Sequence, residues 1–98
     1  MSIESVLSPD NKILTISIAG RFDFELVQEF RSTYTNRQSV SYIIDMRDTE
    51  HMDSSALGML LNMRKTLGED TKISIINCRP QIKKILTISR FDKKFDID

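Results

Sequence analysis

Alternating apolar and polar residues near the amino terminus predict a β-hairpin. Residues 2–7 alternate loosely, and an aliphatic residue stands at every second position from Leu14 to Ile18. Residues 8–11 between them read Ser-Pro-Asp-Asn, in which proline fixes one backbone dihedral of a turn and Asp or Asn tolerates the next. We therefore expect two antiparallel strands, the second of which covers residues 12–19 and ends at Gly20.

Three later segments place apolar residues at the spacing of an α-helix. Asp23 is positioned to cap the first, Gly68 closes the second, and Pro80 opens the third, where a proline is well tolerated. The buried stripes expected for the three helices are Leu26, Phe30 and Tyr34; Ala56, Leu60, Met63 and Leu67; and Ile82, Ile85 and Leu86.

Between and after these helices lie three further strand-like runs, at residues 40–46, 72–77 and 91–97. The first is apolar on both faces at Ile43 and Ile44, a pattern typical of a central parallel strand. Strand and helix thus alternate from residue 12 onward, which predicts an α/β fold with right-handed crossovers. We expect residues 1–98 to form a single domain with a mostly parallel mixed sheet, an amino-terminal antiparallel hairpin strand, and helices after strands 2, 3 and 4.

The composition argues against several classes of partner. Lysine and arginine total 14, as do aspartate and glutamate, so no net field attracts nucleic acid or an anionic membrane. No signal-like segment opens the chain and no apolar run approaches about 18 residues, so we expect a cytoplasmic protein without direct membrane insertion. The single cysteine, Cys78, cannot form an internal disulfide and is expected to be a reduced thiol.

Residues 51–61 join a strand-like run to the second helix and contain the candidate functional residues. Asp53 or Ser54 can cap this helix, which puts Ser55 in its first turn. At roughly 100° per residue, Ser55 falls away from the apolar stripe, so we expect it to face solvent. The same polar side of the helix carries Ser54, Ser55, Gly58, Asn62 and Lys65.

A hydroxyl in the first turn of a helix is suited to regulation by phosphate. A phosphate there meets unpaired amide hydrogens and the positive end of the helix dipole, so the helix tolerates it. A partner packed on the same face would meet about two new negative charges, to which Asp53 adds repulsion. Gly58 has no side chain, which lets a partner's backbone approach beside Ser55. The alternative is that residues 53–55 only cap the helix.

A second polar position is expected at the same edge of the sheet. Asp23 follows the second strand, and Asp53 to Ser55 follow the run that contains the third strand. Ligands and partners of open α/β sheets gather at the carboxyl ends of strands, so these two stretches should converge on one surface. Asp23 is compatible with both capping and partner contact.

The order of elements and the residues D-S-S-A-L-G, which begin at Asp53, resemble the STAS family, best known through anti-sigma factor antagonists. The resemblance makes Ser55 the phosphoacceptor, because the second serine of the D-S-S motif has that role in the family. Residues 20–23, Gly-Arg-Phe-Asp, resemble the family's turn whose acidic residue, here Asp23, lies near that serine. The similarity covers nearly the full chain.

The resemblance implies a non-enzymatic binding switch without a cofactor. Its unphosphorylated form would bind a serine protein kinase that resembles an anti-sigma factor, phosphorylation at Ser55 would release that partner, and a serine phosphatase would reverse the change. The residues expected at the partner surface are Asp23, Asp53, Ser54, Ser55, Gly58 and Asn62. An alternative within the family is a STAS subunit of a membrane lipid-transport ABC complex, which the short chain and Ala56, where several sigma-pathway relatives have glycine, leave open.

Three enzymatic or metal-binding alternatives receive little support from the sequence. His51 precedes the helix and has no evident third group to orient it, which argues against a serine nucleophile at Ser55. Asp45, Asp48 and Asp53 could suggest a Mg²⁺ cluster, but no suitably placed lysine accompanies them. The chain also lacks a G-x-x-x-x-G-K loop, so a phosphoryl donor would have to be bound by a partner. We assign no catalytic residue and no metal ligand.

Overall fold

The computed structural model describes residues 2–35 and 40–98. The strands are β1 (Ile3–Leu7), β2 (Ile13–Ile18), β3 (Gly20–Phe22), β4 (Ser41–Asp45), β5 (Thr49–Met52), β6 (Ile73–Ile76) and β7 (Asp96–Ile97). The helices are η1 (Phe24–Leu26, 3₁₀), α1 (Val27–Ser32), α2 (Ser54–Leu67), α3 (Pro80–Ile88) and η2 (Phe91–Lys93, 3₁₀). None of the helices in the described part is long and apolar enough to cross a membrane.

Five strands form the main sheet in the order β1-β2-β4-β6-β7. β1 pairs with β2 antiparallel, and all the other pairs are parallel. This is the expected mixed sheet with an antiparallel hairpin strand, and the α/β fold class is confirmed. β4 takes the central position predicted for residues 40–46.

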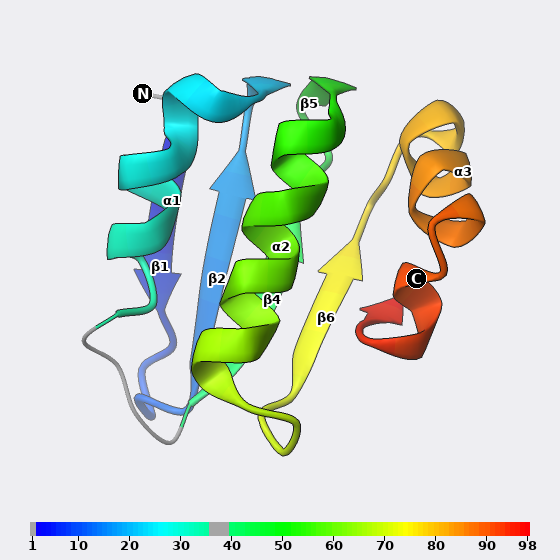
Figure 1. The fold of residues 1–98 in the computed structure, drawn as a ribbon. Coiled ribbons are helices and arrows are strands. Elements are labelled where there is room, and N and C mark those ends of the chain that lie inside the picture. Colours follow the sequence, from blue (N-terminus) through cyan, green and yellow to red (C-terminus); the bar gives the residue numbers. More distant parts are fainter. Residues whose placement is uncertain (1, 36–39) are drawn as a thin grey trace.

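One face of the sheet is covered and the other is largely open. In Figure 1, α1 and α2 lie side by side in front of the sheet, and α3 lies beyond β6. The strand residues below the helices are buried, and they include Leu14, Ile16, Ile18, Tyr42, Ile44, Ile73 and Ile75. Ile43 points to the opposite face and is only half-buried, so β4 is central without being covered on both faces.

The first helix is shorter than its sequence pattern suggests. A 3₁₀ turn, η1, follows Asp23, and the α-helix proper runs only from Val27 to Ser32. The predicted stripe is nevertheless buried at Leu26, Phe30 and Tyr34. Packing thus follows the apolar spacing even where the backbone departs from α geometry.

The predicted strand over residues 91–97 is mostly wrong. Residues 91–93 form η2 instead, and only Asp96 and Ile97 pair with β6. Phe91 and Phe95 are both buried and their rings stack with centroids 5.7 Å apart. A helical turn brings residues four apart into contact, whereas an extended strand would hold them on one face but about 13 Å apart.

A buried arginine ties this carboxyl-terminal segment to α2. The guanidinium of Arg64 donates hydrogen bonds to the backbone carbonyls of Lys94, Gly68 and Thr71. The Arg64 Cζ atom also lies 5.2 Å from the centroid of the Phe95 ring. Because Arg64 is only 8% exposed, these carbonyls supply the polar contacts that its charge needs in the core.

Candidate functional site

Asp53 caps α2, which decides between the two capping residues predicted from the sequence. Its backbone is extended, with φ −118° and ψ −173°, and its Oδ1 atom accepts hydrogen bonds from the amides of Ser55 (3.0 Å) and Ala56 (3.2 Å). Ser54 is therefore the first helical residue, and Ser55 is the second. The first-turn position predicted for Ser55 is confirmed.

The Ser55 hydroxyl is hydrogen-bonded to the same carboxylate. Ser55 Oγ donates to Asp53 Oδ1 at 2.5 Å. This bond is the main reason that the pKa of Asp53 lies below its ordinary value; burial opposes the shift, and the amides of Ala56 and Ser55 and the charge of His51 support it. The cap and the candidate phosphoacceptor thus form one hydrogen-bonded unit.

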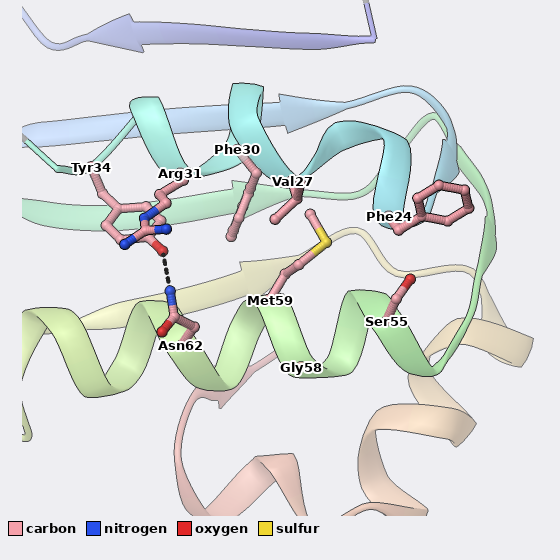
Figure 2. Close-up of a pocket in the computed structure, with 9 residues that line it drawn as sticks. All are labelled: Phe24, Val27, Phe30, Arg31, Tyr34, Ser55, Gly58, Met59 and Asn62. Carbon is pink, nitrogen blue, oxygen red and sulfur yellow. Dashed lines mark hydrogen bonds between the residues drawn. The ribbon is translucent and has the colours of Figure 1, made fainter.

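Ser55 is less exposed than its helical angle suggests. Ser54 is exposed, whereas Ser55 is half-buried and, in Figure 2, its hydroxyl lies on the side of α2 that faces η1 and α1. The expectation that Ser55 simply faces solvent is therefore only partly right, because the helical angle does not take account of the neighbouring helix. Gly58 and Asn62 are exposed, as expected.

A small second sheet brings Asp23 to the site. β3 and β5 pair in parallel, with Phe22 opposite Met52, so Asp23 and Asp53 follow neighbouring strand ends. Asp23 is itself a cap, because its Oδ1 atom accepts the Glu25 amide at 3.0 Å. The predicted convergence of the two acidic loops is present in the structure, and the pairing that produces it was not predicted.

A groove between α1 and α2 opens beside Ser55 (Figure 2). Its volume is about 460 Å³, and its lining residues are Phe24, Val27, Phe30, Arg31, Tyr34, Ser55, Gly58, Met59 and Asn62. Phe24 is 67% exposed and Val27 is 41% exposed, so both present apolar surface to solvent at the groove. At the end opposite Ser55, Asn62 Nδ2 donates to Tyr34 Oη at 3.3 Å.

The half of this groove that comes from η1 and α1 was not predicted from the sequence. The sequence contains one pattern that indicates it: Phe24 and Val27 are apolar but lie outside the buried stripe of Leu26, Phe30 and Tyr34. Large apolar residues outside a core stripe are candidates for a contact surface.

The structure gives no geometry for a serine nucleophile with a histidine base. His51 is exposed on β5 opposite Arg21, and the hydroxyl of Ser55 is directed to Asp53 instead. Across residues 2–35 and 40–98, no cluster of three or more His, Cys, Asp or Glu side chains could hold a metal ion. Asp45 Oδ1 accepts bonds from the Arg47 amide and from Asn77 Nδ2.

Comparison with known families identifies the domain. The model of the STAS domain matches residues 5–98. The chain belongs to the STAS domain family. A STAS-domain containing protein of Pseudomonas aeruginosa is 46% identical over 101 residues, which cover 99% of each chain.

Solved structures of STAS proteins share the fold. An anti-sigma factor antagonist from Mycobacterium paratuberculosis has a TM-score of 0.79 and 20% identity, over 98% of this chain and 85% of that one. The Bacillus cell fate determinant SpoIIAA in its phosphorylated form has a TM-score of 0.72 and 21% identity, over 98% and 90% of the two chains. At these identities the likeness establishes the fold of this STAS domain.

Proposed function

We propose that this STAS domain is a non-enzymatic binding switch controlled by phosphorylation of Ser55. Its unphosphorylated form binds a serine protein kinase that resembles an anti-sigma factor, the phosphorylated form releases it, and a serine phosphatase restores binding. The observation that carries the proposal is the position of the Ser55 hydroxyl, which lies in the first turn of α2, bonded to Asp53 and at the rim of an apolar groove.

Phosphorylation of Ser55 would change the charge of this surface strongly. A phosphoserine carries about −1.5 to −2 charges at pH 7, and it would lie against the Asp53 carboxylate that the hydroxyl now contacts. Asp23, at the neighbouring strand end, adds a second carboxylate. A partner that fits the neutral serine would meet a concentrated negative charge, whereas the helix dipole would lessen the cost to the domain itself.

The family supports this proposal at a general level. Several solved structures similar to this chain are anti-sigma factor antagonists, and the structure of one of them, SpoIIAA, has been solved in the phosphorylated form. The proposed partner surface comprises Asp23, Asp53, Ser54, Ser55, Gly58 and Asn62, together with the groove residues Phe24 and Val27. We propose that the switch acts in the cytoplasm, in the same compartment as its kinase and phosphatase.

Mass spectrometry of the protein purified from its native cells tests the proposal. We expect a phosphorylated fraction whose phosphate maps to Ser55, and we expect Ser55→Ala to remain unmodified in those cells. Ser54→Ala is the matched control and should still be phosphorylated, because Ser54 is not the cap. Phosphate on Ser54, or continued phosphorylation of Ser55→Ala, would contradict the assignment.

Binding provides the second arm of the test. Ser55→Asp should weaken binding of the partner by at least about tenfold, or about 1.4 kcal/mol, without a change in fold. Ser55→Ala should bind like the natural protein. Equal binding by Ser55→Asp and Ser55→Ala would show that charge at this position does not control the partner.

A further inference from the structure

We propose that the groove between α1 and α2 docks one amphipathic helix of a protein partner, whose apolar side chains lie beside Phe24 and Val27 and whose acidic side chain pairs with Arg31. This inference rests on the proposed function, because it names the chemistry of the partner that Ser55 would control. It concerns the groove between α1 and α2, which continues from the loops that carry Asp23 and Asp53.

The shape of the groove favours a protein over a small molecule. Phe24 stands at its rim with 67% of its surface exposed, so the groove is open along one side. Small-molecule sites usually enclose most of their ligand, whereas exposed aromatic residues are typical anchors of protein interfaces. An open groove with apolar walls between two helices suits the binding of a third helix.

The length of the groove matches two turns of a helix. α1 and α2 run in the same direction, and the groove extends between them from Ser55 to Asn62 (Figure 2). Asn62 stands seven positions after Ser55 in α2, which corresponds to a rise of about 10.5 Å at 1.5 Å per residue. Anchors at i, i+4 and i+7 on a docked helix cover the same distance.

Gly58 allows a docked helix to come close to α2. It lies midway along the groove, and a Cβ atom built on it would meet nothing within 4 Å. The glycine is therefore not required by packing within the domain. A side chain at this position would project into the groove and hold the docked helix away from α2.

The charge of the groove selects an acidic helix. Arg31 is the charged residue among those that line it, and it stands beside Tyr34 at the end opposite Ser55 (Figure 2). Within the described residues, no carboxylate forms an ion pair with Arg31, which is exposed. A carboxylate on the partner would gain a planar, bidentate contact there.

The docking is tested by reversing the charge on a helical peptide and, separately, the charge of Arg31 on the protein. The probe is a hydrocarbon-stapled helical peptide with Leu at i, i+4 and i+7 and Glu at i−4 and i+11, which allows either direction of docking. Its counterpart has Lys at both charged positions. Binding is measured by fluorescence anisotropy, and its place by shifts of the backbone amide signals in nuclear magnetic resonance spectra.

We expect the Glu peptide to shift the amides of Val27, Gly58 and Met59, and to bind at least about tenfold more tightly than the Lys peptide. Arg31→Glu should reverse this preference, whereas Lys84→Glu, the same charge change on α3, should not. Gly58→Leu should abolish binding while retaining the fold, because leucine favours a helix more than glycine does.

Three results would overturn the docking proposal. One is that neither peptide shifts the groove amides, and another is that Arg31→Glu leaves the preference unchanged. The third is that another occupant fills the groove. Groove signals that depend on protein concentration without peptide would indicate a second copy of the chain, and a stronger response to decanoate than to the Glu peptide would indicate a small amphiphile. Phosphorylation of Ser55 is measured separately, so failure here is distinguishable from failure of the proposed switch.

Discussion

Asp53 and Ser55 are joined by a 2.5 Å hydrogen bond from the serine hydroxyl to the carboxylate that also caps α2. The same oxygen atom therefore holds the helix start and orients the candidate phosphoacceptor. Phosphorylation would remove the hydroxyl proton that makes this bond, so a modification at Ser55 also acts on the cap.

Replacing the cap should destabilise the domain more than replacing the residue beside it. Asp53→Ala removes the acceptor of the Ser55 and Ala56 amides, and we expect a fall of several degrees in Tm. Ser54→Ala is the control and should leave the Tm almost unchanged, since Ser54 makes no cap bond. Thermal unfolding followed by circular dichroism compares the two, and equal losses would contradict the capping role of Asp53.

The pKa of Asp53 predicts how the cap responds to acid. Because this pKa is lower in the folded protein than in the unfolded chain, the charged carboxylate stabilises the fold above the unfolded value, and this stabilisation is lost as the pH falls through the folded value. Ser55→Ala removes the main cause of the shift and should raise the pKa of Asp53. Titration of the Asp53 side-chain carbon signal measures both values, and an unchanged pKa in Ser55→Ala would contradict the assigned cause.

The two faces of α2 should respond differently to truncation. Leu60→Ala leaves a cavity in the core, where Leu60 is fully buried, and should lower the free energy of unfolding by about 2 to 5 kcal/mol. Asn62→Ala should cost only about 0.5 kcal/mol, because Asn62 is exposed and its bond to Tyr34 is long at 3.3 Å. Urea unfolding gives both values, and similar losses would show that the faces are wrongly assigned.

Arg64 should be essential for the carboxyl-terminal segment. Arg64→Met retains much of the apolar side chain but leaves the carbonyls of Lys94, Gly68 and Thr71 without their donor, so we expect a loss of at least about 2 kcal/mol. The adjacent Lys65→Met is the exposed control and should be nearly neutral. Hydrogen exchange should become faster around residues 91–97 in Arg64→Met, and unchanged exchange there would contradict the role of this contact.

The protein alone should not phosphorylate itself. The chain has no G-x-x-x-x-G-K loop to hold a triphosphate, so incubation with Mg²⁺ and ATP should add no phosphate to Ser55. Intact-mass measurement is the readout, and Ser55→Ala controls for phosphate at other positions. A mass increase of one phosphate in a preparation free of other kinases would contradict the passive role of this STAS domain.

Local sequence patterns were sufficient to predict most of the framework. The spacing of Leu14, Ile16 and Ile18 and the cap before α2 depend on interactions between residues close in the chain, so they are readable without a structure. The same kind of reasoning failed for residues 91–97. There the stacking of Phe91 on Phe95, and the contact of the Phe95 ring with Arg64, outweigh local strand propensity.

The sequence by itself determined the fold class, a helix start at residue 53 or 54 and the first-turn position of Ser55, because apolar periodicity and capping act over a few residues. Only the tertiary structure decided that Asp53 is the cap, and that the pairing of β3 with β5 is what brings Asp23 and Asp53 to neighbouring strand ends. It also decided that Phe24 and Ser55 border one groove, because the groove exists only when α1 packs against α2. Contacts between segments about thirty residues apart depend on the packing of the whole chain, which no local pattern encodes.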